Sequence, residues 1–133
     1  ENVSTQEVEE VLARYPGVDL AVVYGVEVPG TEGRAGMAAL ASTGELDLSG
    51  PEFFRHVEQL PGYARPVFVR VIGQADMTGT FKVRKVELQR QGFAPDAVDS
   101  PVYMRDAIDD AAGRYRVLDA ETFQRLRSGG IRF

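Results

Sequence analysis

The chain has 133 residues and a mass of 14.6 kDa, which is enough for one domain with a core of its own. It contains no cysteine and a single histidine, so thiol catalysis, disulfides, Cys-based zinc sites and His-rich metal sites are excluded. No apolar run approaches the roughly 18 residues of a membrane-spanning helix, and a net charge of −5 argues against a nucleic-acid-binding protein.

The charge is unevenly distributed along the chain. Residues 1–60 have a net charge of −8, residues 61–90 a net charge of +4, and residues 91–133 a net charge of −1. The middle of the chain is therefore a basic island between acidic parts. This pattern favours an anionic small-molecule ligand over DNA.

The first half of the chain predicts a helix, a hairpin and a second helix. Apolar residues at i, i+3, i+4 and i+7 predict a helix over residues 6–15. Residues 19–27 are rich in β-branched and aromatic side chains and predict a strand, paired with a second strand over 37–41 across a glycine-rich loop at 29–36. A capping box at residues 49–52 starts the second helix. Its apolar face consists of Phe53, Phe54, Val57 and Leu60. We assign this face to the core rather than to an acyl-binding groove.

The second half predicts a central strand, a helix and a terminal hairpin. Residues 67–72 alternate as a strand that puts Phe68, Arg70 and Ile72 on one face. A helix follows over 81–90. Two short strands over 102–105 and 114–118 then form a hairpin, and Asp119 caps a last helix.

These elements predict an α+β domain with a small, mostly antiparallel sheet flanked by helices and an added C-terminal hairpin and helix. We expect residues 1–92 to form the core of the domain and residues 93–133 an extension packed on it. The chain begins at Glu1 without an initiator Met or a signal-peptide pattern, directly before a capping box at residues 4–7. We therefore expect a fragment of a longer protein, with a processed small protein as the alternative.

The two lysines of the chain, Lys82 and Lys85, lie close together in a sequence with 13 arginines. In a sequence where arginine is so common, a lysine indicates a position that needs a compact ammonium group. Before Lys82, a glycine and two hydroxyls (Thr78, Gly79 and Thr80) stand between a strand and a helix, where a ligand can approach the backbone and anions are favoured. The spacing is not that of a P-loop. Lys82 either stabilises an anion during group transfer or is a solvated surface lysine.

Several motifs, taken in order, resemble those of the adenylate-forming acyl-CoA synthetases, the ANL superfamily. Residues 1–9 resemble the end of the hinge motif, residues 23–26 and 33–39 the strand pair that follows, and residues 60–66 the Leu-x-x-Tyr-x-x-Pro turn. Residues 78–82, Thr-Gly-Thr-Phe-Lys, fall where the family has its terminal lysine motif. This form is similar to that of the fatty acid transport protein branch, whose members are long- and very-long-chain acyl-CoA synthetases.

The resemblance implies the mobile C-terminal lid domain of an ATP-dependent fatty acyl-CoA ligase. Lys82 would match the catalytic lysine of the first half-reaction, which joins the acyl carboxylate to ATP and gives acyl-adenylate and pyrophosphate. Thr78, Gly79 and Thr80 would lie near the nucleotide as motif positions. Phe81 stands where most of the superfamily has glycine, which leaves the local backbone geometry open.

In the second half-reaction the resemblance implies that the domain turns, withdraws Lys82 and presents the surface near Glu1 and Asn2 to CoA. Arg34, in the glycine-rich loop, would meet the CoA nucleotide phosphate, unless it is a solvated loop arginine. ATP, CoA and Mg would be needed by the full-length enzyme, whose N-terminal domain would be the partner. The fragment alone is expected to need none of them, to hold no metal and to be inactive.

Two other interpretations remain open. One is a stand-alone α+β protein-interaction module, and the other is the same superfamily acting on an aryl acid or an amino acid. We expect a cytoplasmic protein without a membrane span in this stretch, and leave open a peripheral membrane attachment of the full-length protein. The arginine-rich composition is compatible with a bacterial origin.

Overall fold

The computed structural model describes residues 5–27, 34–42, 44, 46–72, 88, 90, 102–106 and 114–127. The elements in chain order are α1 (Thr5–Ala13), β1 (Leu20–Glu27), β2 (Arg34–Ala41), α2 (Pro51–Val57), the short 3₁₀ helix η1 (Gly62–Ala64), β3 (Phe68–Ile72), β4 (Val102–Asp106), β5 (Arg114–Val117) and α4 (Ala120–Arg127).

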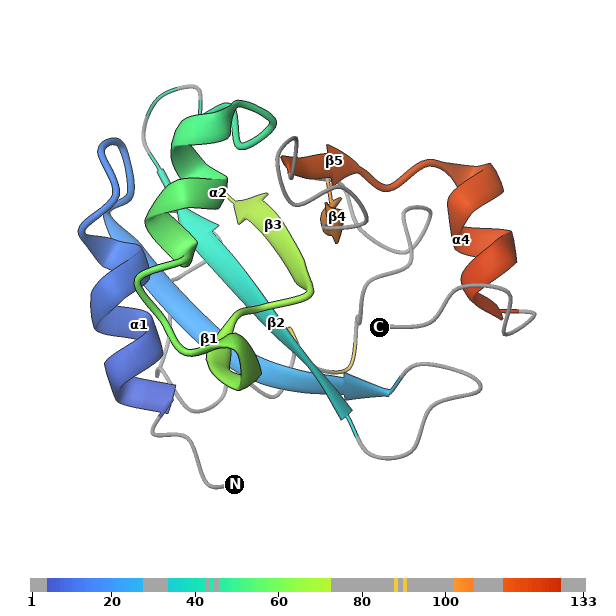
Figure 1. The fold of residues 1–133 in the computed structure, drawn as a ribbon, viewed down its shortest axis with the longest axis horizontal. Coiled ribbons are helices and arrows are strands. Elements are labelled where there is room, and N and C mark those ends of the chain that lie inside the picture. The colour runs from blue at the N-terminus through green and yellow to red at the C-terminus, as the bar shows by residue number, and fades with distance from the viewer. Residues whose placement is uncertain are drawn as a thin grey trace.

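The five strands form one sheet in the order β1-β2-β3-β4-β5 (Figure 1). Only β2 and β3 run parallel, while the other three pairs are antiparallel. The strands β2 and β3 can run parallel because the chain that connects them, which includes α2, crosses back along the sheet. The strand β3 therefore starts at the same end as β2. The predicted α+β class and the mostly antiparallel sheet are confirmed.

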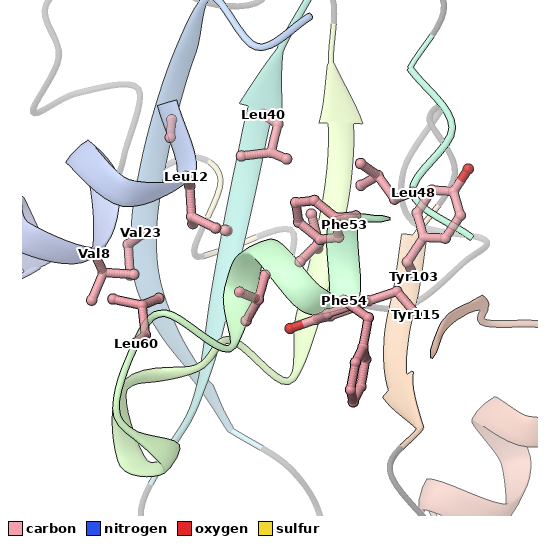
Figure 2. Packing of buried hydrophobic residues seen from close by; sticks show 14 residues of the cluster. Val8, Leu12, Val23, Leu40, Leu48, Phe53, Phe54, Leu60, Tyr103 and Tyr115 are labelled. Carbon is pink, nitrogen blue, oxygen red and sulfur yellow. The ribbon is translucent and has the colours of Figure 1, made fainter. Parts of the chain in front are cut away.

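The sheet buries a hydrophobic cluster on each face. We call the face covered by α1 and α2 the first face. Figure 2 shows side chains of both helices packing onto the strands there. The cluster on the opposite, second face also takes in Leu88, Leu118 and, in part, Phe123 of α4. The strand residues of the second face are Val22, Tyr24, Val26, Met37, Ala39, Ala41, Phe68, Ile72 and Val102.

The hairpin of β1 and β2 is longer than the sequence predicted. The antiparallel pairing continues through Gly25 opposite Gly36 to Glu27 opposite Arg34. The N–H of Val67 also donates to the carbonyl oxygen of Gly36 at 2.9 Å, so this part of β2 is bonded on both sides. The prediction that Arg34 lies in a loop was therefore wrong, because Arg34 is the first residue of β2.

The helix α2 begins differently from the prediction. Its N-cap is Gly50, with Pro51 at the start and no side-chain capping bond, so the predicted capping box was wrong. Ser49 instead donates its N–H and its hydroxyl to Oδ1 of Asp47, at 2.9 and 2.6 Å. These two bonds hold the pKa of Asp47 below its usual value. The apolar residues of this segment are buried, as predicted: Phe53, Phe54, Val57 and Leu60.

The predicted C-terminal hairpin and cap are confirmed. The antiparallel strands β4 and β5 extend the sheet beyond β3. Tyr115 of β5 is fully buried on the first face, where its ring meets that of Phe53 with the ring centroids 5.0 Å apart. Asp119 accepts the N–H of Thr122 at 2.7 Å, which lowers the pKa of Asp119 and caps α4. Of the predicted helix over 81–90, Leu88 and Arg90 are described and both are helical.

Candidate functional site

The segment that carries the predicted lysine motif leaves the sheet from the end of β3. Thr78, Gly79, Thr80 and Lys82 lie outside the described residues, but the chain on both sides of the segment is described. Ile72, the last residue of β3, and Leu88, which follows the segment, are both buried in the cluster of the second face. Both ends of the segment are therefore anchored on the same face of the sheet.

The end of the sheet at Ile72 is held by backbone hydrogen bonds. Leu20, Ala41 and Ile72 lie next to one another across three strands. The N–H of Ser42 donates to the carbonyl oxygen of Ile72 at 3.1 Å, and the N–H of Asp19 donates to that of Ala41 at 2.8 Å. Ser42 is buried, and its hydroxyl donates to the carbonyl oxygen of Gly44 at 3.1 Å. The end of β3, after which the lysine segment begins, is therefore hydrogen-bonded to the chain at the end of β2.

Of the residues predicted for the CoA side, Glu1 and Asn2 lie outside the described residues. Arg34, whose backbone is described, starts β2 and pairs with Glu27 at the end of β1. The seven residue steps from Arg34 to Ala41, beside Ile72, span roughly 23 Å. Arg34 and Ile72, after which the predicted lysine segment begins, thus lie at opposite ends of the sheet.

Arg70 is the only charged side chain among the described residues that is buried, with 6% of its surface exposed. It lies two residues before the end of β3, between Ala39 of β2 and Val102 of β4. Because these two neighbours belong to the second-face cluster, Arg70 lies on the face that also receives Leu88. The alternating sequence pattern correctly predicted Arg70 on the same face as Phe68 and Ile72, without a function for it. The sequence feature that could have drawn attention to Arg70 was an arginine among apolar residues on one face of an alternating strand.

Tyr24 is the second polar group buried on this face. It is 4% exposed, and its hydroxyl has no hydrogen-bond partner among the described residues. Burial raises the pKa of Tyr24 well above its usual range, and the positive charge of Arg70 acts in the opposite direction. The two side chains belong to β1 and β3, on either side of β2.

His56, the single histidine, has a packing role. Its Nε2–H donates to the carbonyl oxygen of Val11 at 2.6 Å, and Nδ1 accepts from the amide of Gln59 at 3.1 Å. The imidazole also meets the ring of Tyr15, with the ring centroids 5.2 Å apart. His56 therefore joins α2 to the end of α1. No group of three or more acidic or histidine side chains in the described part of the chain could hold a metal ion.

The chain belongs to the family of the AMP-binding enzyme C-terminal domain, whose family model matches residues 7–82. The matched region ends at Lys82. The strands β4 and β5 lie beyond it, although they complete the sheet.

The chain is similar to proteins named as long-chain fatty acid transport proteins. It is 44% identical over 132 residues, or 98% of its length, to long-chain fatty acid transport protein 1 of Homo sapiens, and 42% identical over 133 residues, or 99%, to long-chain fatty acid transport protein 3 of Mus musculus. The predicted resemblance to this branch is confirmed. The chain spans about a fifth of these relatives, 20% of each. Both relatives are mammalian and give no support to a bacterial origin.

Among solved structures, the chain is similar to o-succinylbenzoate CoA synthetase (MenE) from Bacillus subtilis. The TM-score is 0.49 at 24% sequence identity, over 75% of this chain and 19% of that chain. A likeness of this size says nothing about ligand or substrate. No helix in the described ranges has the length and apolar content needed to cross a membrane.

Proposed function

We propose that the chain is the C-terminal lid domain of an ATP-dependent ligase that joins long- or very-long-chain fatty acids to CoA. The observation that carries this proposal is the family match over residues 7–82, which ends at Lys82, together with 40–44% identity to long-chain fatty acid transport proteins over nearly the whole chain. The N-terminal domain of the same parent chain is the partner on which the lid closes, and ATP, CoA and Mg are bound by the closed enzyme.

Lys82 acts in the first half-reaction. A carboxylate oxygen of the fatty acid attacks the α-phosphorus of ATP, the bond to the leaving oxygen breaks, and pyrophosphate departs. The ammonium group of Lys82 bridges the carboxylate and the α-phosphate and stabilises the charge that develops between them. Thr78, Gly79 and Thr80 shape the turn that presents this lysine to the nucleotide.

The lid turns between the two half-reactions. In the second, the sulfur of CoA attacks the acyl carbon, and AMP leaves with the electrons of the broken bond. Glu1, Asn2 and Arg34 belong to the CoA side of the lid. The separation of the two ends of the sheet supports this division, because Ile72 and Arg34 lie roughly 23 Å apart along it. A rotation of the rigid sheet exchanges one end for the other.

The test is Lys82→Ala in the full-length protein that contains this chain. We expect fatty-acid-dependent exchange of pyrophosphate into ATP to fall by roughly 100- to 1,000-fold, because a charge-stabilising group is lost at the reacting centre. Transfer of the acyl group from supplied acyl-adenylate to CoA should change by less than about threefold. Lys85→Ala, a lysine in the same segment, is the matched control.

Three results would contradict parts of this proposal. Survival of both half-reactions in Lys82→Ala would remove the lysine assignment. Faster exchange with an aryl acid or an amino acid than with a fatty acid would change the substrate class. Failure of the full-length protein to form any adenylate would favour an interaction module.

A further inference from the structure

We propose that Tyr115 is a positioning residue for the CoA side of the lid, because it fixes Pro66 and thereby the end of β2 that begins at Arg34. Its effect on the reaction rests on the proposed function. Its hold on Pro66 does not, because hydrogen bonds between described residues carry it.

Pro66 is the point at which Tyr115 holds the chain before β3. The hydroxyl of Tyr115 donates to the carbonyl oxygen of Pro66, a fully buried residue. Proline has no N–H, so the carbonyl oxygen is the one backbone group through which Pro66 can be hydrogen-bonded. Because little water reaches a buried residue, removing the hydroxyl leaves this acceptor without its donor.

Packing holds the ring of Tyr115 in place. The ring is fully buried, and its centroid lies 5.0 Å from that of Phe53 and 6.2 Å from that of Phe54 (Figure 2). Arg105, the partner of Tyr115 on β4, lies with its Cζ 4.0 Å from the centroid of the Phe54 ring. A ring enclosed in this way points its hydroxyl in one direction.

Two backbone hydrogen bonds extend this hold from Pro66 to β2. The N–H of Val67 donates to the carbonyl oxygen of Gly36 at 2.9 Å, and the carbonyl oxygen of Val67 accepts the N–H of Arg105 at 2.7 Å. A Cβ placed on Gly36 would lie 3.7 Å from Cα of Pro66, so the two backbones lie side by side. Gly36 stands two residues after Arg34. The phenol is thereby connected to the end of β2 that belongs to the CoA side.

The hold acts at one end of the sheet. The five residue steps from Val67 to Ile72 span roughly 17 Å. At the far end of these steps, the carbonyl oxygen of Ile72 accepts the N–H of Ser42, a bond in which Tyr115 has no part. We therefore expect a change at Tyr115 to affect the CoA side and to spare the end of the sheet after which the lysine segment begins.

The first experiment measures amide hydrogen exchange on the 133-residue chain, with Tyr115→Phe beside the wild type. We expect the amide of Val67 to exchange at least about tenfold faster relative to the amide of Ser42, because the bond at Pro66 is lost while the bond at Ile72 is kept. A uniform loss of stability would leave this ratio unchanged.

Tyr103→Phe is the matched control for this experiment. Tyr103 belongs to the same cluster, but its phenol interacts with Asp47 and Leu48. Its substitution should leave the ratio of the Val67 and Ser42 amides within about threefold of the wild-type value.

The second experiment measures the two half-reactions in the full-length protein. Tyr115→Phe should raise the KM for CoA in transfer from supplied acyl-adenylate by roughly 3- to 10-fold, since small displacements of a binding group weaken its contact with the ligand. Fatty-acid-dependent exchange of pyrophosphate into ATP should stay within about twofold. In an Arg34→Ala background, Tyr115→Phe should change this KM by less than about twofold, because the effects of residues that act together do not add.

Several outcomes would overturn the inference. An unchanged ratio of the Val67 and Ser42 amides would remove the hold on Pro66, and equal losses in both half-reactions would leave Tyr115 only a stabilising role. Failure of Tyr115→Phe to fold would likewise assign Tyr115 to the core alone. If Arg34→Ala leaves CoA transfer unchanged, the CoA side of the proposed function fails, but the exchange ratio still decides whether Tyr115 holds Pro66.

Discussion

Tyr115 joins three parts of the chain through one side chain. Its ring packs between Phe53 and Phe54 of α2, and its hydroxyl donates to the carbonyl oxygen of Pro66, just before β3. Burial raises the pKa of Tyr115 to about 12, against which the positive charge of Arg105 acts. The buried phenol therefore keeps its proton at a pH where the phenol of an unfolded chain would lose it.

This raised pKa predicts a loss of stability at alkaline pH. The contribution of Tyr115 is fully present below about pH 10, the pKa of a free tyrosine, and it declines toward pH 12 by about 1.4 kcal/mol per pH unit. Tyr115→Phe should cost about 1 kcal/mol at pH 8, because the bond to Pro66 is lost. Its disadvantage should shrink between pH 10 and pH 11, which urea unfolding at each pH measures. A constant difference over this range would contradict the assignment.

At the scale of single elements, α1 protects an edge of the sheet. Among the described strands β1 pairs with β2 alone, and the N–H of Val23 donates to Oε2 of Glu9 at 2.8 Å. An unpaired strand edge invites association with another chain, and a carboxylate that occupies its N–H groups prevents this. Glu9 thus links the helix to the strand and covers part of its edge.

Glu9→Ala should therefore loosen β1. We expect the free energy of unfolding to fall by about 1–2 kcal/mol, since a bond to a charged group is lost. The amide of Val23 should also exchange faster by roughly tenfold, while that of Ala38, its partner in β2, stays protected. Glu10→Ala is the matched control, because Glu10 is exposed on the same helix. Equal effects of the two substitutions on Val23 would rule out the role of Glu9.

Local sequence patterns predicted most helices and strands, but they did not predict all of the strand pairings. Strand alternation placed Phe68, Arg70 and Ile72 on one face because the period of a strand is set by its own backbone. The parallel pairing of β2 with β3 depends on a long connection that no local pattern encodes. The capping box failed because α2 begins at Pro51 with Gly50 as its N-cap, so Ser49 does not stand at the capping position.

The candidate site was predicted from motif resemblance, and the structure shows where the neighbouring described residues lie in the sheet. Lys82 and its neighbours were singled out by residue type and motif, and they lie outside the described residues. The opposite placement of Ile72 and Arg34 could not be predicted, because it depends on how β1, β2 and β3 are ordered in the sheet. Arg70 was visible in the sequence as an arginine among apolar residues, but its burial depends on packing by distant segments.

At the scale of the whole molecule, the residues beyond the matched family region complete the domain. Tyr103 and Tyr115 belong to the first-face cluster, and Val102 and Leu118 to the second. The strand β4 also supplies one of the two neighbours of β3. We therefore propose that residues 93–133 are an integral part of the domain rather than an independent appendage.

Removing residues 93–133 should prevent cooperative folding. A chain of residues 1–92 leaves one side of β3 unpaired and removes large buried side chains, each worth about 3–5 kcal/mol in a core. We expect no cooperative urea transition and no near-ultraviolet circular dichroism from packed aromatic rings. A chain of residues 1–119, which keeps β4 and β5 and lacks α4, is the control and should unfold cooperatively. A cooperative transition in the shorter chain would contradict the proposal.

The central position of β3 has a consequence for synthesis on the ribosome. This strand finds its parallel neighbour as soon as α2 has formed, but its antiparallel neighbour β4 lies some thirty residues further along. Until β4 has emerged from the ribosome, apolar residues such as Phe68 and Val69 lie on an unpaired edge of β3. Closing such a long loop is slow. The nascent domain therefore keeps this side of β3 unpaired until the ribosome has synthesised β4.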